Sequence, residues 1–218
     1  MTQLWWDVAR AGGLLAWGLL SASVLWGLAL SSRIFGRRPR PAWLLDLHRY
    51  LGGLAVIFVG VHVAAIMLDT FVSFGPAEAF IPFVSSWNPG AVAWGIVALY
   101  LLLAVELTSL ARSHLPLRLW RRVHYLSFGV FVFSTVHLLT AGTDRNNPAL
   151  LLAVVAVCGA VVLLTALRVT PKNRQPFAPR PTRTPRSGGP VAPGPARNPR
   201  PRPPVASRPA RTPTVTVR

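Results

Sequence analysis

The stretch DLHRYLGGLAVIFVGVHVAAIML, residues 46–68, decides the fold: it is an apolar run that carries histidines at positions 48 and 62. A helix of roughly 20 apolar residues crosses the ~30 Å hydrocarbon core of a bilayer. Four further segments share this length and character, at residues 11–31, 90–111, 121–141 and 148–168. The connections between the segments are short, so we predict an all-α fold, an integral membrane bundle of about five transmembrane helices with antiparallel neighbours.

The composition also favours a membrane protein. The chain has 218 residues, of which 52% are hydrophobic and 13% are charged, and its mean hydropathy is +0.44. Such a chain is too apolar for an ordinary water-soluble domain. The single cysteine, Cys158, lies in an apolar run, which excludes a disulfide framework and a cysteine-ligated iron–sulfur cluster. Any metal must therefore have other ligands.

The formal net charge of +17 is concentrated in the C-terminal part of the chain. Lys172 and ten arginines follow position 171, in a segment without acidic residues that is rich in Pro, Ser, Thr and Gly. We expect residues 1–170 to be the helical domain and residues 171–218 to be a disordered basic tail. The tail could bind anionic lipid or a protein partner, or only reinforce the topology. Nucleic acid is not an expected partner, because the tail lacks interleaved aromatic residues.

The distribution of arginine predicts the orientation in the membrane. The connections after the first and third helices contain four arginines each and are predicted to be cytoplasmic, whereas those after the second and fourth contain none and one. We therefore expect a multi-pass protein of the plasma membrane with its N-terminus outside and its tail in the cytoplasm.

Four of the five histidines form a regular pattern. His48 and His62 are fourteen residues apart, close to four helical turns, so their side chains project from nearly one face about 21 Å apart. His124 and His137 are thirteen residues apart in the fourth helix. Both helices run from the inside to the outside, so the histidines match by depth. We predict an inner pair, His48 with His124, and an outer pair, His62 with His137.

These two pairs have the chemistry of haem ligands. Neutral imidazole binds iron well, and two axial imidazoles complete the coordination of a haem iron. We therefore predict that the four histidines are the metal ligands of two stacked b haems, and six-coordinate haems of this kind favour electron transfer. Arg49, Arg121 and Arg122 lie at the cytoplasmic level, where they could bind the haem carboxylates. Arginine at inner helix ends is, however, also what topology alone requires.

Each of these residues also has a simpler interpretation. A single histidine in a membrane helix can be a polar residue that hydrogen-bonds to a neighbouring helix. His114, in the third connection, has no partner at matching depth and is expected to be a solvated loop residue. We expect Glu106 to pair with a histidine, an arginine or the backbone. Close approach of a flat haem requires small residues, and we predict that Gly52, Gly53 and Gly129 supply them. These glycines could equally reflect ordinary helix packing.

The spacing of thirteen residues does not suit a straight helix, because it leaves His124 and His137 about 140° apart in azimuth. We expect one of two irregularities. The helix is distorted near Gly129 or near Ser134 and Thr135, or His124 lies in an irregular first turn after the arginines.

Two motifs resemble the ferric reductase-like transmembrane domain: LHRYLG at residues 47–52, followed by His62, and WRRVHYL at residues 120–126, followed by His137. This superfamily includes the membrane parts of ferric reductases and NADPH oxidases and the haem-binding subunit of the bacterial methionine sulfoxide reductase system. The resemblance covers residues 43–168. It implies two b haems on the four histidines, with electrons passing from the cytoplasmic face to an external acceptor.

The tail contains neither strands nor a GxGxxG turn, so we expect no FAD or NAD(P) site in this chain. The expected electron donor is a separate dehydrogenase or a membrane quinol, which makes the chain a cytochrome b-like oxidoreductase subunit. The alternative is a haem-free membrane scaffold that presents its basic tail to a partner or to anionic lipid. Transport through the histidines and Glu106 is a weaker hypothesis, because no helix has the pattern of a broken transporter helix.

Overall fold

A computed structural model describes residues 2–32, 41–70 and 74–169. Throughout these ranges the regular structure is helical and no strand occurs, which confirms the all-α prediction. Five helices are long and apolar enough to cross a membrane, as predicted. The prediction of a disordered tail over residues 171–218 lies outside the described residues.

The helices begin and end close to the predicted positions, with two exceptions. The first helix begins at position 2, nine residues earlier than predicted, and the fourth span is divided into two helices. The elements are α1 (Thr2–Ser31), α2 (Ala42–Leu68), α3 (Pro76–Phe80), α4 (Pro89–Leu110), the 3₁₀ helix η2 (Ala111–His114), α5 (Leu117–His124), α6 (Leu126–Ala141) and α7 (Pro148–Val169).

Prolines at the first helical position begin α4 and α7, where the missing N–H would have no partner within the helix. The start of α7 is also capped, because the Ala149 N–H donates to Asn147 Oδ1 at 2.9 Å. Both helix starts follow loops at the same end of the bundle.

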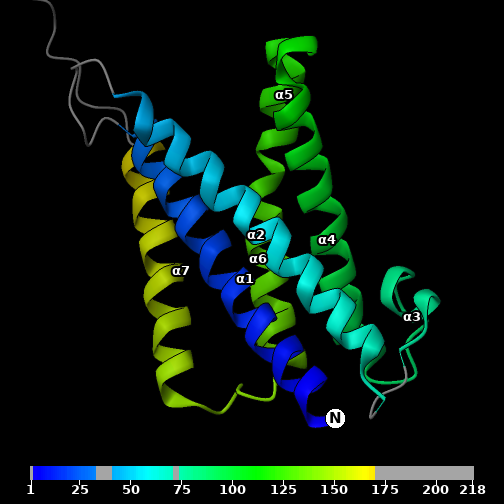
Figure 1. Ribbon diagram of the computed structural model, residues 1–218. Coiled ribbons are helices and arrows are strands. Elements are labelled where there is room, and N and C mark those ends of the chain that lie inside the picture. Colours follow the sequence, from blue (N-terminus) through cyan, green and yellow to red (C-terminus); the bar gives the residue numbers. More distant parts are fainter. Residues whose placement is uncertain (1, 33–40, 71–73, 170–218) are drawn as a thin grey trace, which may run out of the picture. The chain divides into compact units, whose positions relative to one another are not determined.

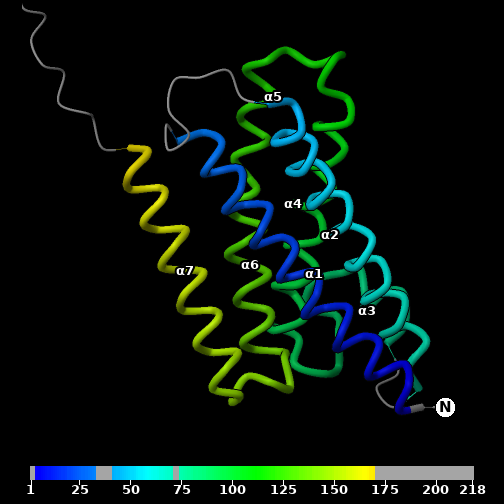
Figure 2. Tube along the Cα trace, turned by 60° about the vertical axis from the view of Figure 1, so that its left-hand side comes forward, coloured from blue at the N-terminus to red at the C-terminus, as the bar shows by residue number. Residues whose placement is uncertain are grey.

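The helices that carry the paired histidines lie opposite each other in the bundle. Helix α1 packs along α2, and α4 packs along α6. Helix α1 also contacts α6, and α4 contacts α2, whereas α2 and α6 scarcely touch. Helices α1 and α4 therefore flank the space between α2 and α6, and α7 packs outside against α1 (Figures 1 and 2).

A layer of buried apolar side chains lies halfway along the bundle. Ala55 of α2 is fully buried, and Val130 of α6 is 2% exposed. They pack with Leu20, Leu102 and Val105 from α1 and α4. Ala55 and Val130 each lie midway in sequence between the two histidines of their span, so this layer separates the two histidine levels.

The irregularity in the fourth span lies at Tyr125, directly after His124. Helix α5 ends at His124 and α6 begins at Leu126, and the Phe128 N–H donates to the Tyr125 carbonyl three residues earlier. The predicted distortion near Gly129 or near Ser134 and Thr135 is wrong, because α6 continues through all three positions. The alternative placed His124 in an irregular first turn; His124 is instead the last residue of α5, and the irregularity follows it at Tyr125.

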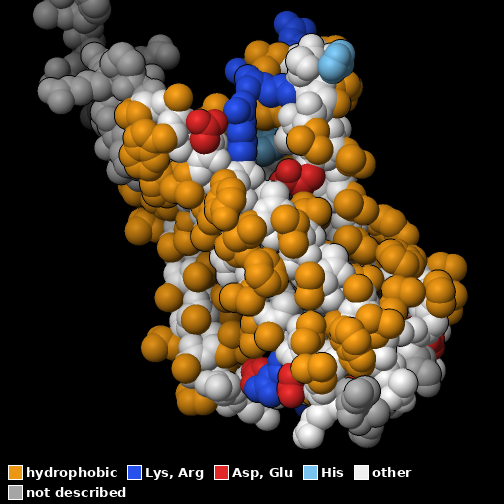
Figure 3. Space-filling model, viewed as in Figure 1, with side chains coloured by type: hydrophobic (Ala, Val, Ile, Leu, Met, Phe, Trp, Pro, Cys, Tyr) orange, Lys and Arg blue, Asp and Glu red, His pale blue; other side chains and the backbone are white. Residues whose placement is uncertain are grey.

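The surface has the pattern of a membrane protein. Hydrophobic side chains cover the middle of the bundle, and Lys and Arg side chains gather at the end that carries α5 (Figure 3). The side chains of α7 are largely exposed, for example Leu152 at 71%. A bilayer would surround such a helix, since lipid chains are as apolar as these residues.

Candidate functional site

The structure brings the histidines together as two pairs, in the combinations predicted from their depth. The His48 and His124 ring centres are 6.1 Å apart, with an interplanar angle of 78°. The His62 and His137 ring centres are 6.3 Å apart, with an angle of 77°. Each histidine of α5 and α6 therefore faces one of α2.

The spacing within each pair fits two axial ligands of one iron. A metal–imidazole bond of about 2 Å, with about 1.1 Å from the nitrogen to the ring centre, places two such rings about 6.3 Å apart. Edge-to-face aromatic contacts also occur at separations of about 4.5–7 Å. The ring spacing therefore fits both interpretations, and the hydrogen bonds of the histidines distinguish them.

Hydrogen bonds hold three of the four rings through Nδ1. His62 Nδ1 lies 2.6 Å from the Ala9 carbonyl oxygen, and His137 Nδ1 lies 2.8 Å from the Ala91 carbonyl oxygen. A carbonyl only accepts, so Nδ1 of both rings carries the proton and Nε2 keeps its lone pair. Metal-binding histidines typically donate their second N–H in this way. The His62/His137 pair therefore has the tautomer that an iron ligand needs.

Glycines make room for the same three rings. A Cβ atom at Gly13 would lie 2.9 Å from His62 Nδ1, and one at Gly95 would lie 2.8 Å from His137 Nδ1. At Gly27 the Cβ would lie 3.1 Å from His48 Cε1. Contacts below 3.0 Å would force the ring to move, so a side chain at Gly13 or Gly95 would displace its histidine.

The three sites share one local arrangement. The residue whose oxygen contacts Nδ1 lies four positions before the glycine, one helical turn away, in each of the sets Ala9/Gly13, Ser23/Gly27 and Ala91/Gly95. At His48 the contact is with the Ser23 hydroxyl, 3.3 Å from Nδ1, and a hydroxyl can donate or accept. The repeated combination of acceptor, glycine and histidine indicates three similar ring-binding sites.

His124 departs from this arrangement. Its Nδ1 is buried and has no hydrogen-bond partner among the described residues. Its ring stacks instead on Trp120, with ring centres 5.0 Å apart and planes inclined by 22°. The guanidinium of Arg112 lies over the other ring in this stack, 4.6 Å from the Trp120 centroid. The residue fourteen positions after Gly95 is Ser109, and its buried hydroxyl likewise lacks a partner in the described part of the chain.

The glycines that contact the histidine rings are not the glycines predicted from the sequence to face the haems. Gly52 lies against Glu106, where a Cβ would be 2.7 Å from Oε1; Gly53 faces open space, and Gly129 meets the side chain of Leu101. Protein side chains occupy the space at Gly52 and Gly129, so the haem-facing role predicted for these two is wrong, whereas that of Gly53 stays a prediction. A signal was present, because Gly13 and Gly27 are fourteen residues apart, the same spacing as the histidines of the antiparallel neighbour α2.

Glu106 was predicted to pair with a histidine, an arginine or the backbone. Across the described ranges its carboxylate makes no hydrogen bond or ion pair with another residue, so this prediction is wrong. Gly52 leaves the space that the carboxylate occupies between α4 and α2.

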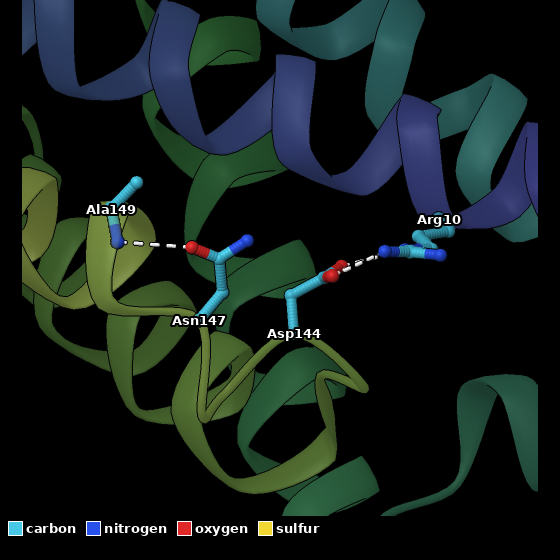
Figure 4. A network of polar contacts seen from close by, with 4 residues as sticks. All are labelled: Arg10, Asp144, Asn147 and Ala149. Carbon is cyan, nitrogen blue, oxygen red and sulfur yellow. Dashed lines mark hydrogen bonds and ion pairs between the residues drawn. The ribbon is translucent and has the colours of Figure 1, made fainter.

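A cavity extends from His62 and His137 to the end of the bundle opposite α5. Its walls are mainly apolar and aromatic, and its polar end contains Arg10, Asp69 and Asp144. Arg10 of α1 forms an ion pair with Asp144, in the turn between α6 and α7 (Figure 4). The Arg10 Nε–H donates to Asp144 Oδ2 at 2.6 Å, and this hydrogen bond lowers the pKa of the Asp144 carboxyl. The pair joins α1 to the last two helices.

The predicted carboxylate-binding arginines are exposed at the end that carries α5. Arg49 lies 3.4 Å from Asp46 one turn earlier in α2. Arg121 and Arg122 lie on α5, beside His124 in sequence. His114, expected to be solvated, is exposed at the end of η2 and contacts Ser113.

The chemistry of the donor set suits haem better than a bare metal ion. Within the described ranges no group of three or more His, Cys, Asp or Glu side chains could hold a metal ion. A haem iron needs only two protein ligands, because the macrocycle supplies the others. The paired histidines, their tautomers and their glycines therefore fit that group.

Residues 12–135 match the family described as "Ferric reductase like transmembrane component". The chain belongs to this family. The family match confirms the resemblance seen in the two motifs; it includes most of α1 and ends two residues before His137. The comparisons with curated proteins and with solved structures found no match. Family membership and the five apolar helices make this chain a multi-pass membrane protein, and the family indicates transmembrane electron transfer in general.

Proposed function

We propose that this chain carries electrons across the plasma membrane through two b haems, one held by His48 and His124 and the other by His62 and His137. The observation that carries the proposal is the geometry of the two pairs, with ring centres 6.1 and 6.3 Å apart at two levels of one bundle. A bis-histidine haem supplies one-electron chemistry with no open position at the iron.

The protein's own residues would position the ligands and exclude water. The carbonyls of Ala9 and Ala91 keep the protons of His62 and His137 on Nδ1. The buried apolar layer around Ala55 separates the two levels. Arg49, Arg121 and Arg122 are proposed to bind the carboxylates of the haem on His48 and His124.

The proposed direction is outward. On the predicted orientation, the arginine-rich end with α5 faces the cytoplasm and the cavity beside His62 and His137 opens to the outside. The donor is then a separate dehydrogenase or a membrane quinol, and the acceptor is an external ferric complex or a partner protein. We assign residues 1–170 to the haem-binding domain and residues 171–218 to a basic tail.

A reduced-minus-oxidised optical spectrum of the purified full chain, with haem quantification, tests the proposal. We expect a b-type signal and two haems per chain. Absence of haem from protein made under haem-replete conditions would reject it. Deleting residues 172–218 should leave haem content and reduction unchanged. Loss of cellular activity in that variant with intact haems would favour the scaffold alternative.

A further inference from the structure

Three of the four histidines are held by the same kind of contact, and the fourth is not. His48, His62 and His137 each have an oxygen acceptor at Nδ1, whereas the buried Nδ1 of His124 has no partner among the described residues. A ligand ring without this second contact is free to rotate about its bond to the metal, unless something else fixes its plane.

Trp120 is placed to fix that plane. It lies one helical turn before His124 in α5, and the two rings are stacked at 5.0 Å with planes inclined by only 22°. The indole also contacts Arg112 of η2, whose guanidinium carbon lies 4.6 Å from the ring centroid, a cation–π distance.

We propose that Trp120, clamped by Arg112, is a positioning residue that orients His124 by ring stacking, in place of the hydrogen bond that the other three histidines use. This inference rests on the proposed function. It gives a role to Trp120, the first residue of the WRRVHYL motif, and it distinguishes how His124 is held from how the other three histidines are held. Loss of an outer contact to a metal-binding histidine typically costs about 10–100-fold in metal affinity.

The test uses the full chain in a His62→Leu background, where only the haem on His48 and His124 should bind. The measurements are the rate of haem transfer to apomyoglobin and the EPR signal of the ferric haem, which depends on the angle between the axial rings. We expect Trp120→Leu to speed haem loss about tenfold and to shift or broaden the EPR signal. Trp120→Phe, which keeps a stacking ring, should restore both properties. Arg112→Gln should cause a smaller change in the same direction.

Two matched variants complete the test. Trp94 stacks on Phe133 at 5.4 Å, distant in the chain from His124, so Trp94→Leu should leave haem loss unchanged. Ser109→Ala tests whether the serine hydroxyl supports His124 instead. The inference is overturned if Trp120→Leu leaves the rate and the signal unchanged, if Trp120→Phe is as defective as Trp120→Leu, or if Ser109→Ala alone causes the loss. Absence of haem from the unmodified chain would instead reject the proposed function.

Discussion

The two histidine pairs have nearly the same ring geometry but are supported in different ways. His62 and His137 lie in uninterrupted helices and donate to the backbone carbonyls of Ala9 and Ala91. His48 lies 3.3 Å from a serine hydroxyl, and His124 stacks on Trp120 at the end of a short helix. Main-chain carbonyls therefore contact both rings of the His62/His137 pair, whereas the Ser23 and Trp120 side chains contact the rings of the His48/His124 pair. Substitution of Ser23 or Trp120 removes such a contact without changing a histidine or its glycine.

The largest expected effect comes from removing a ligand. His62→Leu should reduce haem content from two per chain to one, because a single axial imidazole would not hold the haem that the pair holds. The haem on His48 and His124 should remain reducible, while electron transfer across the membrane stops. Haem quantification and reduction in proteoliposomes measure both effects. His114→Leu, at an exposed position, is the control, and retention of two haems in His62→Leu would contradict the pairing.

A smaller but still large effect should follow from filling the space beside a ligand ring. In Gly95→Ala the new Cβ would meet three atoms of the His137 ring at 2.8–3.0 Å, so the ring must move. We expect haem affinity at the His62/His137 site to fall at least about tenfold. Gly27→Ala should be milder, since its nearest contact is 3.1 Å.

Gly159→Ala in α7 is the matched control, because nothing lies within 4 Å of its Cβ. Haem titration of the three variants ranks them. Equal affinities in Gly95→Ala and Gly159→Ala would show that the glycine does not make room for the ligand.

A moderate effect is expected where a side chain supports the ring. Ser23→Ala removes the acceptor at His48 Nδ1, which makes the imidazole less electron-rich and favours the reduced iron. We expect the midpoint potential of the haem on His48 and His124 to rise by less than about 59 mV, a tenfold change in the one-electron equilibrium. Ser21→Ala is the control, since the Ser21 hydroxyl has no hydrogen-bond partner within the described residues. A redox titration in which both serine variants have the midpoint potential of the unmodified chain would show that Ser23 does not influence the haem on His48 and His124.

The smallest effect concerns the ion pair at the mouth of the cavity beside His62 and His137. The pKa of Asp144 is lowered by the hydrogen bond from Arg10, so the pair stabilises the fold above the ordinary Asp pKa of about 3.9. This contribution is lost as the pH falls through the lowered pKa of the folded state. Asp144→Asn should therefore lower the melting temperature slightly at pH 7, and by less near pH 3, below the ordinary Asp pKa.

Thermal unfolding in detergent at the two pH values measures the difference. Asp46→Asn is the matched control, because Asp46 lies 3.4 Å from Arg49 and both side chains are more than 60% exposed. An Asp144→Asn variant as stable as the unmodified chain at pH 7 would show that the ion pair does not stabilise the fold.

Much of the arrangement follows from local sequence. Apolar runs of sufficient length determine the spans. In the bilayer core a single segment can satisfy the hydrogen bonds of its own backbone only as a helix. The spacing of His48 and His62 determines that both project from one face, because helical rise and twist are constant. The five spans and the facing of the histidines were therefore predictable, and the family was recognisable from two short motifs.

Only the tertiary structure decided what surrounds each ring. Which glycine faces which histidine depends on the register of α1 against α2 and of α4 against α6, and no single helix contains that information. The same applies to Glu106, whose neighbour Gly52 belongs to another helix. The contact of Arg112 with Trp120 beside His124 likewise joins two elements, η2 and α5. The sequence by itself determined the two pairs of histidines and their levels, and packing between helices determined what contacts each ring.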